Sequence, residues 1–208
     1  MLSQILCKLN SPPQVFICAS AVGFYGDSGS IICNEESQNG KGFLADVCQK
    51  WEEAANPARL AGIRTINLRF GVILSPTGGA LAKMLTPFKL GLGGVLGSGN
   101  QYMSWIAIDD VIGIILHLID NSSLSGPINA VAPNPITNRQ FTKTLGEVLH
   151  RPTIIPIPAV VLRLSLGREM ADEMLLNSTR AVPTRLLKSK YKFIYPDLKG
   201  ALYELLQT

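Results

Sequence analysis

Residues 15–26 have the sequence VFICASAVGFYG, and residues 65–74 have the sequence TINLRFGVIL. Each stretch contains a continuous apolar run bounded by turn-forming residues, which is typical of a strand covered on both faces. The segment between them, Phe43–Leu60, has the apolar spacing of a helix, with Leu44, Val47, Trp51 and Ala55 on one face. A strand, a helix and a strand in this order predict a parallel βαβ unit with a right-handed crossover, and therefore an α/β fold.

The rest of the chain continues this alternation. Asp109 and Asp110 are expected to cap a helix at residues 111–120, because a carboxylate accepts the free N–H groups of a first turn. Thr137 or Asn138 is expected to cap the next helix, at residues 141–150. Further helices are expected at residues 1–9, 79–89 and 198–206, with two more helical stretches beyond residue 158, and further strands at residues 102–108 and 128–131.

Composition excludes several classes of protein. Hydrophobic residues make up 47% of the chain and charged residues 16%, which is typical of a globular protein. The net charge is +4, and no Lys/Arg cluster interleaved with aromatic residues indicates a nucleic-acid partner. No apolar run approaches the roughly 18 residues of a membrane span, and the first residues are too short and too weakly basic for a signal peptide. A cytoplasmic location without a membrane partner is expected.

The cysteines and histidines give no sign of a metal site. The four cysteines form no C-x-x-C pair, and His117 and His150 each stand alone. Reduced thiols without disulfides are therefore expected. The acidic pairs Glu35-Glu36 and Glu52-Glu53 are expected to be solvated.

Small and hydroxyl-bearing residues end the first strand, in the sequence ASAVGFYG of residues 19–26. Ligands of open α/β sheets bind at the carboxyl ends of strands, although the pattern also fits an ordinary polar strand end. The segment resembles the Ser-Ser-x-x-Val-Tyr-Gly segment of extended short-chain dehydrogenases such as the UDP-galactose epimerases. Four more segments are similar to the same group in the same order: Asn67–Val72, Pro76–Gly79, Trp105–Val111 and Gly126–Asn129.

A bacterial subfamily of this group is more similar still. Its members are described as nucleoside-diphosphate-sugar epimerases, and some carry an older label as cell-division inhibitors. The resemblance covers nearly the whole chain, including the tail from Pro152, and is closest at Tyr25–Asp27, Lys50–Glu52, Leu90–Gly99 and Asn134–Asn138.

The resemblance implies a Rossmann-like, doubly wound parallel sheet with a smaller C-terminal substrate domain. Residues 1–78 would belong to the NAD(P)-binding domain, and residues 79–208 would form mainly the substrate domain and tail, with the strand at 128–131 returning to the main sheet. The implied function is that of an NAD(P)-dependent epimerase or oxidoreductase acting on a small molecule such as a sugar or sugar derivative. The choice between NAD and NADP stays open, and an oligomer is compatible with the sequence.

The resemblance also implies site residues. Ser20 and Tyr25 are the catalytic candidates, and the cofactor-lining candidates are Ala19, Ser20, Phe70, Gly71 and Val72. The substrate would face Leu81, Met84, Gly97 and Trp105.

Two catalytic positions depart from the superfamily. Its enzymes use a Tyr-x-x-x-Lys pair, in which the lysine lowers the pKa of the tyrosine for proton exchange during hydride transfer. Leu44 and Cys48 occupy the aligned positions here. Tyr195 and Lys199 match the pair by spacing alone and are expected to be structural. These departures keep open an alternative function, a binding or regulatory protein that retains the fold without chemistry.

Two ligand-binding features of the superfamily also differ. A Rossmann site needs G-x-G-x-x-G after its first strand, so that a helix N-terminus meets the pyrophosphate. Nothing before Val15 supplies this motif, so an N-terminal segment of the fold is expected to be absent from the chain. Met103 stands where UDP-sugar epimerases place an arginine on the diphosphate. The tail arginines Arg163, Arg168, Arg180 and Arg185 would either meet a phosphate or, as expected for most of them, face solvent.

Overall fold

The computed structural model describes residues 2–207, and its main sheet is parallel. The strand order is β1 (Val15–Ala21), β3 (Arg64–Phe70), β7 (Gly126–Ala130). Ser20 pairs with Arg69 and Ala21 with Phe70, so β1 and β3 end side by side. The predicted α/β fold and its parallel βαβ unit are confirmed.

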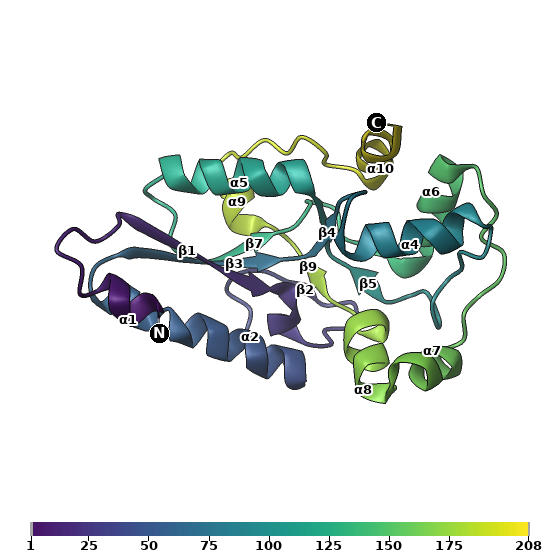
Figure 1. Ribbon diagram of the computed structural model, residues 1–208, viewed down its shortest axis with the longest axis horizontal. Helices are drawn as coiled ribbons and strands as arrows, with labels where there is room; N and C mark the ends of the chain where they lie inside the picture. Colours follow the sequence, from purple (N-terminus) through teal and green to yellow (C-terminus); the bar gives the residue numbers. More distant parts are fainter. Residues whose placement is uncertain (1, 208) are drawn as a thin grey trace.

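Helices cover both faces of the sheet (Figure 1). On one face lie α1 (Leu2–Leu6), α2 (Phe43–Ala54) and α3 (Asn56–Leu60), and on the other lie α5 (Ile108–Asp120) and α9 (Thr184–Lys188). The α5 face is the more apolar, because Ile114 and Leu118 pack against Ile66, Leu68 and Ile128 of the sheet.

The predicted helix at Phe43–Leu60 differs from the structure in two ways. It is divided into α2 and α3 at Ala55, just before Pro57, which lacks the N–H that an uninterrupted helix needs. Trp51, which was placed on the apolar face, is 54% exposed, whereas Ala45 and Cys48 are buried. The small side chains of α2 therefore form much of its buried face.

The strand predicted at residues 65–74 is two strands. Gly71 separates β3 from β4 (Val72–Leu74), which leaves the main sheet and pairs with β6 (Trp105–Ala107). A Cβ atom at Gly71 would lie 2.5 Å from the carbonyl oxygen of Ser104, so only glycine allows this approach. The strand predicted at 102–108 is likewise divided, into β5 (Tyr102–Met103) and β6.

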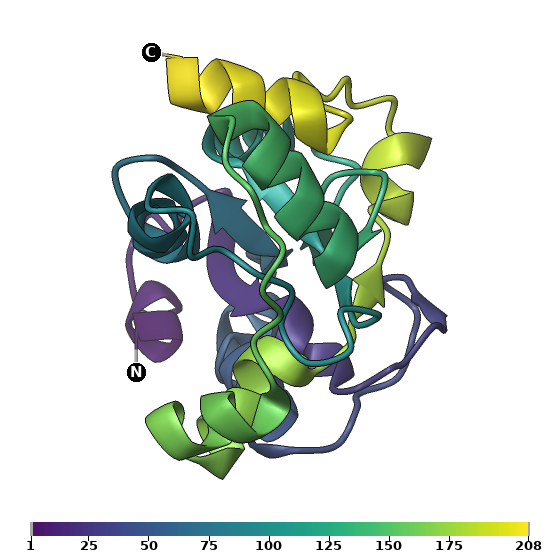
Figure 2. The same ribbon diagram turned by 90° about the vertical axis from the view of Figure 1, so that its right-hand side faces the viewer.

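A smaller lobe lies beside the sheet (Figure 2). Its helices are α4 (Gly79–Lys89), α6 (Asn138–Leu149), α7 (Ala159–Leu166), α8 (Arg168–Ala171), the π-helix η2 (Asp172–Leu176) and α10 (Leu198–Gln207). Of the two residues expected to cap α6, Thr137 is the N-cap, and its hydroxyl accepts from the backbone N–H of Gln140 in a capping box.

Short strands connect the lobe to the rest of the molecule. β8 (Ile136–Thr137) pairs with β5, and β9 (Arg180–Ala181) pairs with β2 (Ile32–Cys33) in the loop after the 3₁₀ helix η1 (Val22–Tyr25). The loop at residues 27–42 thus contains a strand that the sequence pattern does not reveal. Through β9, the tail is attached next to the end of β1.

The predicted cap of α5 is wrong. Ala107 is the N-cap, and Asp110 lies inside the first turn with no exposed surface. Its carboxylate accepts instead from the backbone N–H groups of Ile194 and Tyr195, at 2.8 and 3.0 Å. Asp110 therefore ties the tail to the sheet layer.

Two absences hold for residues 2–207. In this range every helix is too short or too polar to cross a membrane. The same range contains no group of three or more His, Cys, Asp or Glu residues that could hold a metal ion.

Candidate functional site

A buried ion pair lies where β1 and β3 end. Arg69, near the end of β3, donates through Nε to Oε1 of Glu52 on α2 at 2.7 Å and through Nη2 to Oε2 at 2.8 Å. This bidentate geometry is the strongest form of an arginine–carboxylate contact. The guanidinium also lies 3.5 Å from the ring centre of Phe24. The expectation that Glu52 is solvated is wrong.

Three further polar side chains complete this site. The Ser20 hydroxyl donates to Glu52 at 2.8 Å, and Arg69 Nη1 donates to the Tyr25 hydroxyl at 2.9 Å. The Tyr25 hydroxyl in turn donates to Oδ1 of Asn129 on β7 at 2.7 Å. We call Ser20, Tyr25, Glu52, Arg69 and Asn129 the strand-end network. It connects all three strands of the main sheet to α2.

Burial determines what the strand-end network can do chemically. Tyr25 and Arg69 are each 3% exposed. Burial raises the pKa of Tyr25 to about 12, although Arg69 acts in the opposite direction. Burial opposes the charged form of Arg69, but the Glu52 carboxylate holds the pKa of Arg69 above its ordinary value. Tyr25 is therefore a neutral donor at neutral pH, and its hydroxyl is occupied by protein partners. The catalytic roles of Ser20 and Tyr25 stay predictions.

The positions of the superfamily's tyrosine and lysine lie next to this network. Cβ of Leu44 and Sγ of Cys48 are both within 4 Å of the point where a Cβ on Gly23 would lie. Burial raises the pKa of the Cys48 thiol. Leu44 and the protonated thiol thus supply no phenol and ammonium pair at the end of β1.

The cofactor candidates are brought together at one edge. Ala19 is exposed on β1, while Phe70, Gly71 and Val72 are partly exposed where β3 turns into β4. Because neighbouring residues of a strand point to opposite faces, Ala19 and Ser20 cannot both face one ligand with their side chains. Ser20 is turned toward α2 and Glu52.

The substrate candidates are only partly brought together. Leu81 and Trp105 have no exposed surface and lie in the core cluster of the smaller lobe. Met84 lines a cavity of about 750 Å³. Gly97 lies in the glycine-rich loop at residues 91–99, beside Leu96, which lines the same cavity. The backbone of the glycine-rich loop passes close to the chain after α6. A Cβ on Gly94 would overlap the carbonyl oxygen of Ile155.

We call this cavity the apolar pocket. It lies between α4, the glycine-rich loop, the start of α6 and the segment from α8 to η2. Apolar side chains form most of its wall, and Lys83 is its one charged lining residue among those the structure describes. The sequence indicates only Met84 of this wall, because many of the other lining residues come from segments far from α4 in the sequence.

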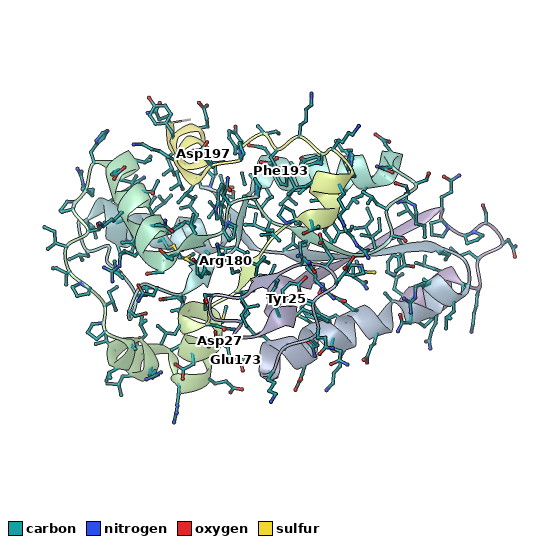
Figure 3. The ribbon with its side chains drawn as sticks, turned by 180° about the vertical axis from the view of Figure 1, so that it is seen from behind. Tyr25, Asp27, Glu173, Arg180, Phe193 and Asp197 are labelled. Carbon is teal, nitrogen blue, oxygen red and sulfur yellow. The ribbon has the colours of Figure 1, made fainter. Side chains whose placement is uncertain are left out.

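A smaller, polar cavity of about 300 Å³ lies at the start of α2. Figure 3 shows Asp27 and Glu173 in this region, below Tyr25. The Glu173 carboxylate, from η2, accepts from the backbone N–H groups of Phe43 and Leu44 at 2.8 Å each. It therefore caps α2 from 129 residues away in the sequence, and no local pattern could have predicted this contact.

The remaining charged candidates have structural partners. Arg163 pairs with Asp172, and Arg185 donates to the carbonyl oxygens of Ser125 and Pro127. Glu35 is buried and accepts from the backbone N–H of Asn129, which corrects the expectation that it is solvated.

The tail pair that matches Tyr-x-x-x-Lys has other contacts. Lys199 forms an exposed ion pair with Glu147 on α6 at 3.3 Å. Tyr195 packs against the core cluster of the smaller lobe, and its backbone N–H is bound by Asp110. These contacts favour the structural role that was expected for both residues.

Comparisons with known proteins identify relatives along the whole chain. Residues 157–205 match a family model described as a domain of unknown function, DUF1731. An epimerase family protein of Mycobacterium bovis is 43% identical over 186 residues, which are 89% of this chain and 62% of that protein. The human epimerase family protein SDR39U1 is 38% identical over 208 residues, covering 99% of this chain and 70% of the human protein. The chain spans about 62% of the length of the mycobacterial relatives.

Solved structures give the same assignment. The crystal structure of human SDR39U1 with NADPH matches with a TM-score of 0.92 and 34% identity, covering 99% of this chain and 70% of that one. A nucleoside-diphosphate sugar epimerase from Corynebacterium glutamicum matches with a TM-score of 0.79 and 39% identity, over 98% of this chain and 40% of its own. These similarities in sequence and fold show that the chain belongs to the epimerase family that includes SDR39U1, within the extended short-chain dehydrogenases.

Proposed function

We propose that this chain forms the nicotinamide side and the substrate lobe of an NAD(P)-dependent epimerase or oxidoreductase. The observation that carries the proposal is the accessible strand-end edge formed by Ala19 and by Phe70, Gly71 and Val72. Ligands of parallel α/β sheets bind at such edges. The NADPH in the crystal structure of the human relative supports the cofactor class.

The residues at this edge fit a flat nicotinamide ring. Ala19 and Gly71 are small, and Phe70 and Val72 offer partly exposed apolar surface. A bound nicotinamide would supply hydride chemistry. The strand-end network would act beneath it as a support, since Arg69 and Glu52 hold the ends of β1 and β3 against α2.

A second candidate is a binding protein that keeps this fold without chemistry. Leu44 and Cys48 favour it, because a leucine and a buried thiol do not replace a phenol activated by an ammonium group. An assay for hydride transfer distinguishes the two candidate functions, because only the enzyme would oxidise NADPH with a carbonyl substrate.

The test is a fluorescence titration of NADPH and NADH against two proteins. One is the 208-residue chain, and the other is this chain fused behind the glycine-rich N-terminal βα units of a relative. We expect the fusion to bind at micromolar concentration and the chain alone at about millimolar, because a pyrophosphate cradle contributes a large share of the contacts. Failure of the fusion to bind either cofactor would contradict the proposal.

A matched pair of variants locates the site. Ala19→Trp should weaken cofactor binding to the fusion at least tenfold, because an indole would occupy the place of the ring. Ala61→Trp, at another exposed alanine in the turn after α3, should leave binding within about twofold. Equal effects of the two substitutions would place the cofactor elsewhere.

A further inference from the structure

The apolar pocket has the size of a small-molecule site. Its volume of about 750 Å³ lies within the range of roughly 300–1,000 Å³ that is usual for ligand pockets. Its wall includes Met84, Phe88, Phe141, Ile157, Met170 and Met174. Three methionines in one wall make a surface that adapts to the shape of an apolar ligand.

The mouth of the pocket exposes apolar side chains. Leu92 is 61% exposed, Met170 52% and Met174 65%. All three line the pocket: Leu92 from the glycine-rich loop, Met170 from α8 and Met174 from η2. An apolar ligand would cover these side chains and so gain the free energy of removing them from water.

The polar groups of the pocket are few. Lys83 is exposed at the rim and forms no ion pair within residues 2–207. Thr142 is 1% exposed, and its hydroxyl has no hydrogen-bond partner among the described residues. Asn138 is occupied, since its Oδ1 accepts from the backbone N–H of Leu96 and its Nδ2 contacts the sulfur of Met103. A ligand would therefore meet one cation and one free hydroxyl.

This inventory does not match a nucleoside diphosphate. A diphosphate carries at least two negative charges, which need several charged donors when they are removed from water. The pocket offers Lys83 alone, and Met103 stands where the UDP-sugar epimerases are expected to have an arginine. Arg163 and Arg185 of the tail are bound to Asp172 and to backbone carbonyl groups.

The position of the pocket connects it to the strand-end edge. Val72, at the proposed nicotinamide edge, and Met84, in the wall of the pocket, pack against the same buried cluster. The pocket and the strand-end edge therefore share one buried core.

We propose that the apolar pocket binds a lipophilic monocarboxylate, with its carbon skeleton inside and its carboxylate at the rim beside Lys83. This proposal rests on the proposed function and names its substrate class. The lipophilic body would pack against the methionine-rich wall, and its single negative charge would lie beside the single cation, Lys83.

The test uses isothermal titration calorimetry on the 208-residue chain without any cofactor. The probes are decanoate below its micellar concentration, decanol and UDP-glucose. We expect decanoate to bind at one site per chain with micromolar affinity, decanol more weakly, and UDP-glucose at least a hundredfold more weakly than decanoate. UDP-glucose binding as tightly as decanoate would overturn the proposal, and so would decanoate binding at many sites.

Variants of the pocket distinguish the contribution of the Lys83 charge to ligand binding from the contribution of the cavity's shape. Lys83→Met should weaken decanoate about fivefold, the scale of a partly exposed ion pair, and leave decanol within twofold. Lys143→Met, at an exposed lysine of α6 that does not line the pocket, should change neither. Met174→Trp, at an exposed position, should narrow the mouth and weaken both ligands at least tenfold. Decanoate binding that none of these substitutions changes would place it outside the pocket.

Failure of this proposal can be distinguished from failure of the proposed function. No cofactor is present in the calorimeter, so decanoate binding stands or falls independently of NADPH. Tight NADPH binding by the fusion together with no decanoate binding would overturn the substrate class alone. Decanoate binding without NADPH binding would overturn the proposed function and leave the pocket as a carboxylate site.

Discussion

The strand-end network and the apolar pocket use polar groups in opposite ways. In the strand-end network every one of the five side chains has a protein partner, from Ser20 to Asn129. In the apolar pocket, Lys83 and Thr142 have no side-chain partner within residues 2–207, and the wall leaves apolar surface exposed at its mouth. A site whose donors and acceptors are already used supports the fold, whereas one with unused polar groups and open apolar walls is prepared for a ligand.

The largest expected effect comes from breaking the ion pair of the strand-end network. Arg69→Met should lower the free energy of unfolding by about 3–5 kcal/mol, because it leaves the Glu52 carboxylate without its partner in a mostly buried site. Urea unfolding followed by circular dichroism measures this loss. Arg59→Met, at an exposed arginine of α3, is the control and should cost less than about 0.5 kcal/mol. If the two variants were equally stable, the network would not support the fold.

Removing the Tyr25 hydroxyl from the strand-end network should have the next largest effect. Tyr25→Phe should lower the free energy of unfolding by about 1–3 kcal/mol, because Oδ1 of Asn129 and Nη1 of Arg69 both lose a partner. The same unfolding experiment at pH 7 measures this change.

The stability of the protein in alkali should depend on Tyr25. Burial raises the pKa of Tyr25 from 10.0 to about 12, so the folded state favours the neutral phenol. This contribution is complete below pH 10 and is lost as the pH rises from 10 to about 12, by up to about 3 kcal/mol. Because burial also raises the pKa of Tyr191, the informative quantity is the difference between wild type and Tyr25→Phe. If the free energy of unfolding changed with pH in the same way in both proteins, the pKa of Tyr25 would not be raised by folding.

The contact that joins the two regions should have a smaller effect. Glu173 caps α2, which carries Glu52, and lies in η2 with Met174 of the apolar pocket. Glu173→Gln should cost about 1 kcal/mol, because a neutral amide loses the interaction of a carboxylate with a helix N-terminus. Glu169→Gln on the neighbouring α8 is the control, with an expected change near zero. Hydrogen exchange at the first turn of α2 should rise in Glu173→Gln alone.

The smallest effect is expected in the apolar pocket. Thr142→Val removes a hydroxyl that has no partner in the described protein, so the free energy of unfolding should change by less than about 0.5 kcal/mol. Thermal unfolding of this variant beside Tyr25→Phe gives the comparison directly. A loss as large as that of Tyr25→Phe would show that the pocket is also part of the structural framework.

Local patterns predicted the elements well and their contacts poorly. The apolar runs of β1 and β3, the helix α4 and an N-cap at Thr137 or Asn138 depend on neighbouring residues, and all were predicted. The break at Gly71 depends on the carbonyl group of Ser104, more than thirty residues away. Trp51 was misplaced because spacing does not show that Ala45 and Cys48 would form the buried face.

The candidate site shows the same division. The sequence led us to expect solvated side chains for the acidic pair Glu52-Glu53, but Glu52 of α2 forms an ion pair with Arg69 of β3 in the folded chain. The edge with Ala19 and Phe70 followed from strand ends and resemblance, and its role as a cofactor site stays a prediction. The apolar pocket draws its wall from several segments that are far apart in the sequence, so of that wall the sequence indicated Met84 alone.

The most direct test of the contrast between the two regions is a nuclear magnetic resonance titration of the ¹⁵N-labelled 208-residue chain with decanoate. Amide signals of Met84, Leu96, Thr142 and Met174 should shift in a saturable way, while those of Ser20, Tyr25 and Arg69 stay within the range of the unaffected core. Saturable shifts at the strand-end network with none around the apolar pocket would contradict the account, because the network would then be the ligand site and the pocket part of the framework.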